Sequence, residues 1–347
     1  MSSIPADGTP PWRGRVLPLW RELAAGPSWR TTLVQVGVVA VLAAVVAFGV
    51  PGAVSPELLA VLTVAACYAL LAAGTNISVG WLGSVTFGQA AFFGCGAYAV
   101  GLVRHGHWPA QNSILLAIAV SAVAGFVAYW LLARYTHITF AMLTLVFGQL
   151  VFLVVSSSTS LGASDGLGGL FREPVFGIST VTDPQFWGFA FAVLVIGLAV
   201  YWWFYRRILA LRMFAVREDA GRMETLGYDV RTLRATAGAL GAALSAMGGA
   251  LYAMYAGATN PTLLAFTLSG AAIFMCFIGG SRYLWGPLIG AVLYTLTVNF
   301  WLQSNRAATL ITGGIFVVVM LVIPNGLLSL PSRLPIHAIA RRLRQPR

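Results

Sequence analysis

The sequence predicts an all-α, polytopic integral membrane protein with about ten transmembrane helices and both termini on the cytoplasmic side. Three observations lead to this prediction. Of 347 residues, 59% are hydrophobic and only 9% are charged, whereas ordinary globular proteins carry about 25% charged residues. Ten segments are apolar over the roughly 20 residues that a membrane-spanning helix needs. The arginines gather in alternate connections between these segments, as the positive-inside rule expects.

The predicted spans follow one another between two basic terminal segments. Residues 1–32 form a cytoplasmic basic leader, residues 33–323 a transmembrane domain, and residues 324–347 a cytoplasmic basic tail. The leader is too long for the basic region of a secretory signal peptide, so we expect the first span to remain uncleaved. The ten spans are 33–50, 57–75, 87–103, 112–133, 138–155, 186–205, 235–256, 263–281, 287–303 and 307–323.

The orientation of these spans follows from the distribution of the 21 basic residues, all of which are arginines. With the N-terminus inside, the cytoplasmic segments hold 18 arginines, and the external loops hold only Arg104, Arg172 and Arg306. Short loops rich in arginine stay on the cytoplasmic side. An even number of spans then places the C-terminus on the same side as the N-terminus.

The second and third spans are joined by an uncharged stretch that is too long for one helix. Its 46 residues, 58–103, would extend about 69 Å at 1.5 Å per residue, more than twice the roughly 30 Å of hydrocarbon. We therefore predict one glycine-rich broken helix, with the break at Gly74, Asn76, Gly80, Gly83 and Gly88. A break at membrane depth requires protein or a water-filled cavity to satisfy the backbone.

Neutral polar side chains are the candidates for lining a solute pathway through the spans. They are Asn76, Ser84, Thr86, Gln89, Gln149 and Asn299. Small residues near the break are equally suited to close helix packing, so both interpretations stay open here.

Residues needed for several kinds of membrane chemistry are missing from the predicted spans. Without any lysine, the chain has no standard ATP-binding P-loop. Apart from Glu57, the first residue of the second span, no Asp, Glu or Arg lies within a span, although proton-driven carriers normally use such groups as relays. His105 and His107 have no third metal ligand nearby, and no nucleophile with a base predicts a catalytic site. We therefore expect no metal, no cofactor and, since the charge is not gathered on a solvated face, no nucleic acid.

The longest charged connection, residues 206–234, has the pattern of a short amphipathic helix. Glu218 and Arg222 form an i,i+4 pair, and Gly227 is placed to end the helix. Four apolar residues share one helical face: Val216, Ala220, Met223 and Leu226. Because a helix of about ten residues is marginal alone in water, the pattern predicts a docking surface. A solvated loop that merely follows the positive-inside rule is the alternative.

Five segments resemble, in order, the permease subunits of branched-chain amino acid ABC importers, the LivM family. The run 83–98 resembles the glycine-rich third-span signature of that family, and 217–230 with 239–255 resembles its cytoplasmic coupling segment and next span. The other segments are 162–167, 279–291 and 324–327. The resemblance covers roughly residues 60–330 and departs from the family pattern at Arg282, Tyr283, Asn325 and the long leader.

The resemblance implies a permease subunit in a prokaryotic cell membrane, surrounded by lipid, that imports branched-chain or other hydrophobic amino acids. It implies three kinds of partner: a homologous LivH-like permease, two cytoplasmic ABC ATPases that bind the ATP, and an extracytoplasmic solute-binding protein. The residues expected to couple to the ATPases are Arg217, Glu218, Ala220, Gly221, Arg222, Met223, Glu224, Leu226 and Gly227. A urea or short-amide importer, or an ATP-independent channel for a small neutral solute, remains an alternative.

Overall fold

The computed structural model describes residues 54–105, 110–135, 137–170, 172, 174, 180–281, 283–302, 314, 326 and 327. Apart from one isolated bridge between Leu167 and Thr259, the secondary structure of this part is helical. The predicted span 33–50 and the leader lie outside the described residues. So do all but one residue of the span 307–323 and all but two residues of the tail.

The described helices agree closely with eight of the predicted spans. The long helices are α3 (Pro56–Asn76), α5 (Ala110–Leu132), α6 (His137–Ser157), α7 (Asp183–Tyr205) and α10 (Val230–Ala256). Shorter apolar helices are α4 (Gln89–His105), α11 (Phe266–Gly279) and α12 (Gly286–Leu302), and α8 (Ile208–Glu218) and α9 (Ala220–Thr225) occupy the charged connection. Single turns are formed by η1 (Ile77–Trp81), η2 (Thr159–Leu161) and η3 (Pro261–Leu264).

Five of these helices are long and apolar enough to cross a membrane. They comprise α3 with its continuation η1, most of α5 and α6, and all of α7 and α10. The helical, multi-pass character of the prediction is confirmed, while the count of ten spans and their orientation stay predictions. One boundary is corrected: α10 begins five residues before the predicted span 235–256, so Arg231 and Arg234 lie in its first turns.

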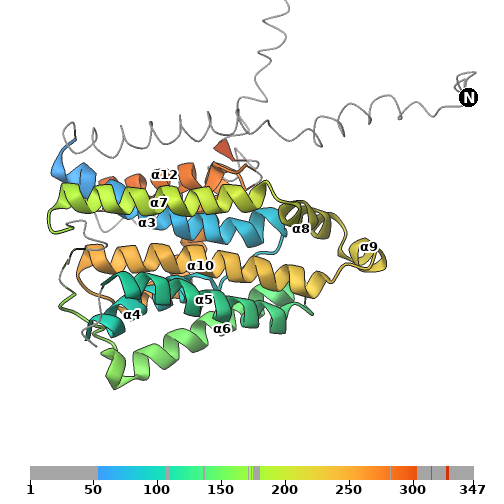
Figure 1. Cartoon of the computed structure of the whole chain (residues 1–347), viewed down its shortest axis with the longest axis horizontal. Helices are drawn as coiled ribbons and strands as arrows, with labels where there is room; N and C mark the ends of the chain where they lie inside the picture. Colours follow the sequence, from blue (N-terminus) through green and yellow to red (C-terminus); the bar gives the residue numbers. More distant parts are fainter. Residues whose placement is uncertain are drawn as a thin grey trace, which may run out of the picture. The chain divides into compact units, whose positions relative to one another are not determined.

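Helix α10 lies at the centre of the described bundle, between α3 on one side and α4 and α5 on the other (Figure 1). Glycines let these helices approach closely. A Cβ atom on Gly249 would lie 1.8 Å from the Phe93 carbonyl oxygen of α4, and one on Gly74 would lie 2.4 Å from the Gly241 carbonyl oxygen. Since real atoms do not approach that closely, these positions admit only glycine. The small residues therefore serve helix packing.

The break after α3 lies later than the glycine pattern predicts. The helix continues through Gly74, Asn76 and Gly80 and ends in the π-helical turn η1 at Trp81. The prediction of a break at those three residues is wrong, because Gly74 packs against α10 and a Cβ on Gly80 would lie 2.3 Å from the Ser281 carbonyl oxygen. The non-helical segment is residues 82–88, in which Gly83 adopts a left-handed φ of 67°.

Helix α4 begins inside the protein rather than at the end of the bundle. Gly241 of α10 contacts both Gly74 and Gln89, so the start of α4 lies beside Gly74. Gly74 is seven residues before Trp81, which corresponds to about 10 Å along the helix axis. Segment 82–88 is therefore non-helical backbone that returns into the bundle.

Side-chain hydroxyl groups satisfy the backbone at this buried helix start. The N–H of Phe87 donates to Thr144 Oγ1 at 3.2 Å, and the N–H of Ala90 donates to Ser269 Oγ at 2.9 Å. The N–H of Gly88 donates to Thr86 Oγ1 at 3.4 Å. A helix start leaves several N–H groups without partners in its own helix, and lipid offers none. Helices α6 and α11 thus supply the acceptors that make the break possible.

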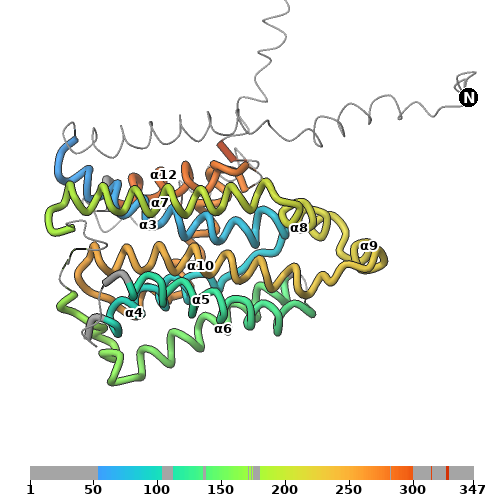
Figure 2. The backbone as a smooth tube through the Cα atoms, viewed as in Figure 1, coloured from blue at the N-terminus to red at the C-terminus, as the bar shows by residue number. Residues whose placement is uncertain are grey.

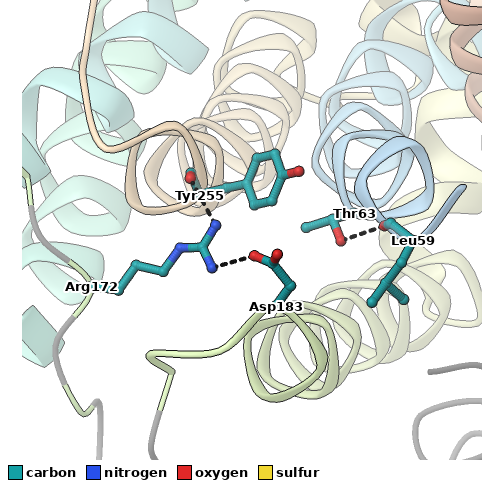
Figure 3. Close-up of polar contacts among 5 residues, drawn as sticks. All are labelled: Leu59, Thr63, Arg172, Asp183 and Tyr255. Carbon is teal, nitrogen blue, oxygen red and sulfur yellow. Dashed lines mark hydrogen bonds and ion pairs between the residues drawn. The ribbon is translucent and has the colours of Figure 1, made fainter. Parts of the chain in front are cut away.

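At the opposite end of the bundle from α8 and α9, one arginine joins three segments. Arg172 forms an ion pair of 2.6 Å with Asp183 at the start of α7, and it donates to the Tyr255 carbonyl oxygen near the end of α10 at 3.3 Å (Figure 3). Its guanidinium also lies 5.0 Å from the ring centre of Phe186. The loop that follows α6 is thereby fixed to both helices.

Candidate functional site

Four of the six predicted pathway residues come together around the break. Asn76, Thr86 and Gln89 are buried, and Ser84 is half-buried in the same turn, with its N–H bonded to the Ser78 carbonyl oxygen at 2.9 Å. Gln149 is half-buried on α6, and Asn299 on α12 donates to the Thr295 carbonyl oxygen of its own helix at 2.9 Å. The structure thus groups four candidates and places two on other helices.

Tyr129 of α5 connects the residues around the break. Its hydroxyl group donates to Thr86 Oγ1 at 3.0 Å, accepts from Gln89 Nε2 at 3.1 Å and lies 3.1 Å from Ser78 Oγ. Gln89 Oε1 in turn accepts from Ser245 Oγ of α10 at 3.1 Å. We call these five side chains the Tyr129 network. It links segment 82–88 and the start of α4 to η1, α5 and α10 through neutral groups.

A second tyrosine holds the last turn of α3. Asn76 Nδ2 donates to the Tyr201 hydroxyl group of α7 at 2.9 Å, and the Tyr201 ring stacks on Trp81 with 5.0 Å between ring centres. Asn76 Oδ1 is buried and has no hydrogen-bond partner among the described residues. An unpaired buried carbonyl group is unfavourable by about 1–3 kcal/mol. The Asn76 amide is therefore the part of the site whose hydrogen bonding is incomplete.

The two tyrosines and two serines of this site were not predicted from the sequence. Tyr129 and Tyr201 lie in apolar helices and are almost completely buried. A buried tyrosine usually hydrogen-bonds through its hydroxyl group, so a tyrosine in the middle of an apolar span was the available signal. Ser78 and Ser245 gave no such signal, because a serine in a membrane helix can bond to its own backbone.

The charged connection forms two short helices instead of the single predicted one. Asp219 has extended backbone angles, φ −159° and ψ 97°, and separates α8 from α9. Its carboxylate accepts the backbone N–H of Arg222 at 3.0 Å and pairs with the Arg222 guanidinium at 2.8 Å. The predicted Glu218–Arg222 pair is therefore replaced by Asp219–Arg222, because aspartate at a helix start captures the free N–H groups there.

The predicted end of the second helix is confirmed. Gly227 has a φ of 83°, and its N–H and that of Tyr228 bond to the carbonyl oxygens of Glu224 and Met223 at 2.9 and 3.0 Å. This pattern is the Schellman motif, which favours glycine. Asp229 then starts α10 by accepting the N–H of Thr232 at 3.1 Å. The hydrogen bond from the Thr232 side chain lowers the pKa of Asp229.

The four predicted apolar residues of this connection do not share one buried face. Val216 and Met223 are buried, but Leu226 is 72% exposed, because the turn at Asp219 redirects the second helix. Glu224 and Arg222 are exposed as well. Helix α9 is the outermost described element at its end of the bundle (Figure 2). It therefore presents both an apolar side chain and charges to its surroundings.

Helix α8 contacts the break directly. The Arg217 guanidinium of α8 donates to the Gly80 carbonyl oxygen of η1. A Cβ on Gly83 would lie 2.7 Å from the Arg217 side chain, so this side chain also covers the left-handed turn. Phe214 of the same helix packs against Trp81, with 6.3 Å between ring centres. The charged connection and the glycine-rich break thus form one contiguous site.

Comparisons with known proteins identify relatives over most of the chain. The family model described as "Branched-chain amino acid transport system / permease component" matches residues 57–323. The High-affinity branched-chain amino acid transport system permease protein LivM of Salmonella typhimurium and that of Escherichia coli are each 26% identical over 314 residues. Each match covers 82% of this chain and 73% of the relative. The probable LivM of Methanocaldococcus jannaschii is 26% identical over 195 residues, 53% of this chain and 54% of the relative. No solved structure matches the chain.

Proposed function

Since the chain belongs to the family of branched-chain amino acid transport system permease components, we propose that it is a transmembrane permease subunit of an ATP-binding-cassette importer. The resemblance to LivM-type permeases is confirmed. The chain is a multi-pass membrane protein and a transport subunit rather than an enzyme. We place it in the cell membrane of a prokaryote, with ten spans and both termini in the cytoplasm.

The proposed complex contains the partners that this role requires. They are a homologous LivH-like permease, two cytoplasmic ABC ATPases that bind ATP, and an external solute-binding protein. The chain has no lysine for a standard P-loop, and the Tyr129 network contains no acidic or basic group that could relay protons. Uphill transport therefore has to be driven by partner subunits.

The proposal for coupling rests on the hydrogen bond from the Arg217 guanidinium to the Gly80 carbonyl oxygen. We propose that α9 and the end of α8 dock on an ATPase, through the exposed Leu226 and the charged residues around it. Movement of α8 would then pull on η1 and on segment 82–88 as a rigid body. The docking surface and the break would be joined by the Arg217 and Phe214 side chains of α8.

We propose branched-chain or other hydrophobic amino acids as the solute, following the names of the two enterobacterial relatives. The grouped candidates Asn76, Ser84, Thr86 and Gln89 are neutral, so the site offers no fixed countercharge for an amino acid. Selectivity would therefore lie in the binding protein, and the isolated permease should show no saturable binding of leucine in the micromolar range.

The proposed function is tested by uptake into sealed proteoliposomes. We expect the complete assembly to concentrate radiolabelled leucine against a gradient with internal ATP and external binding protein. We expect no accumulation when the ATPases are left out. Accumulation by the permeases alone would overturn the proposal, and passive equilibration without ATP would identify a channel. If the assembly took up urea or acetamide in place of leucine, the proposal of an importer would stand and only the proposed solute would change.

Reversing one charge on α9 should abolish transport. We expect Glu224→Arg to reduce ATP-driven uptake to background, because a like charge at a docked interface repels a basic partner residue or leaves it unpaired. Insertion in the membrane should be unaffected, since Glu224 is exposed. Glu57→Arg is the matched control, as it reverses an exposed charge at the start of α3. Normal uptake by Glu224→Arg would remove α9 from the coupling mechanism.

A further inference from the structure

A cavity of about 350 Å³ with several charged residues in its lining lies where α9, the end of α5 and the start of α10 meet. Its charged lining consists of Arg134, Arg231, Arg234 and Glu224. Three arginines therefore line the cavity together with one glutamate. A cavity of this size lies near the lower end of the range of small-molecule sites, about 300–1,000 Å³.

Two of the arginines bind backbone carbonyl groups, and these neutral partners do not cancel the charge of the guanidinium groups. Arg231 lies over the Trp130 ring, 3.4 Å from its centre, and its Nε donates to the Trp130 carbonyl oxygen at 2.9 Å. Arg234 donates from one terminal nitrogen to the Ala133 carbonyl oxygen at 2.6 Å and to that of Tyr135 at 3.3 Å. Both arginines thereby bind the free carbonyl groups at the end of α5, which carries about half a negative charge.

Part of the positive charge of this cavity has no partner in the described part of the chain. Arg134 makes no hydrogen bond or ion pair there, and the buried Nε of Arg234 lacks an acceptor. Each guanidinium has five N–H donors, whereas the contacts of Arg231 and Arg234 use only a few of them. Asp229, which precedes α10, interacts with Arg231. After Glu224, Asp229, the end of α5 and the start of α10 are counted, the cavity retains an excess of about one positive charge. Such a cavity favours an anion with several oxygen acceptors.

The surroundings of the cavity indicate which anion it would receive. On the last turns of α5, Val127, Trp130 and Leu131 are 48%, 39% and 55% exposed. Apolar residues exposed on a membrane helix contact acyl chains, and tryptophan is enriched at the membrane interface. The arginines thus lie where an apolar membrane surface meets the aqueous side, which is the level of lipid phosphate groups. Basic pockets between membrane helices on the cytoplasmic side bind anionic headgroups in other proteins.

We propose that this cavity binds the headgroup phosphate of an anionic phospholipid, through Arg134, Arg231 and Arg234. Arginine suits the role because its planar fork binds phosphate oxygens in pairs. The acyl chains would lie along the exposed face of α5. The inference rests on the proposed function only in assigning this end to the cytoplasmic leaflet. The bound lipid would touch α9, so lipid composition would act on the docking surface.

The test measures lipid binding without transport. Purified full-length chain in neutral detergent is titrated with phosphatidylglycerol or phosphatidylcholine, and the bound lipid is counted by native mass spectrometry. We expect phosphatidylglycerol to bind preferentially. Arg134→Gln should weaken its binding about fivefold, since one basic residue near a membrane surface contributes about 1 kcal/mol. Arg134 is exposed, so the variant should fold normally.

Arg207→Gln is the matched control. Arg207 lies over Trp203, 4.4 Å from the ring centre, near the start of α8 and outside the cavity, and its loss should leave phosphatidylglycerol binding unchanged. Equal weakening by both variants would show general charge attraction and overturn the proposal. Competition by inorganic phosphate would identify a site for a soluble anion, and complete displacement of the lipid by the ATPases would identify a protein-docking site. Each of these results would overturn a lipid site, while failed uptake with intact lipid binding would refute only the proposed transport function.

Discussion

The variant Arg217→Gln should lose ATP-driven uptake by about tenfold or more. Removing the guanidinium abolishes the hydrogen bond to the Gly80 carbonyl oxygen, and a hydrogen bond to a charged group is worth about 1.5–3 kcal/mol. That energy corresponds to a factor of ten or more in the coupling between α8 and the break. ATP hydrolysis by the assembled complex should continue, because α9 keeps its docking residues.

The measurement compares leucine uptake and ATP hydrolysis in the same proteoliposomes. Arg206→Gln is the matched control, because Arg206 lies over the Trp202 ring near α8 and does not reach the break. We expect it to transport normally. If Arg217→Gln transported at the wild-type rate, the contact with Gly80 would have no part in coupling. If it lost hydrolysis together with uptake, Arg217 would act in docking instead.

Gly249→Leu should prevent the bundle from folding. The glycine lies where α10 meets α4, and a Cβ there would come within 1.8 Å of the Phe93 carbonyl oxygen. The two helices would have to separate, because the obstacle is backbone rather than a flexible side chain. Overpacking a core is unfavourable by about 1–3 kcal/mol when side chains can adjust, and a backbone clash should exceed that range.

The outcome is read from the yield of monodisperse protein in size-exclusion chromatography and from thermal unfolding in detergent. Gly188→Leu is the control, since no atom lies within 4 Å of a Cβ at that position on α7. It should give wild-type yield. A stable Gly249→Leu protein would show that α4 and α10 are farther apart than the structure places them.

The fold could be predicted from the sequence where hydropathy alone decides it. Eight apolar segments became helices near their predicted limits, because a buried helix satisfies its own backbone. The break was misplaced because glycine has two roles that composition does not separate. Gly83 adopts a left-handed turn, whereas Gly74 allows two helices to touch. Telling them apart requires the position of α10, which is far away in the sequence.

The candidate site was predictable only in part, for a similar reason. Gly227 ended α9 as expected, since a local turn depends on local sequence. The turn at Asp219 could also have been predicted, because an aspartate that caps the next helix competes with continuation of the preceding one. The pathway candidates Thr86 and Gln89 were chosen for polarity alone. Their common partner, Tyr129, belongs to another helix, and no spacing along the chain connects it to them.

The neutrality of the Tyr129 network also limits how the break would respond to membrane voltage. Moving one elementary charge across 100 mV involves about 2.3 kcal/mol. Ser78, Thr86, Gln89, Tyr129 and Ser245 carry no charge, so their rearrangement moves none through the field. Rearrangement of the network alone would therefore be electrically silent, and any difference in rate between polarised and depolarised vesicles would have to come from the charged Arg217 side chain.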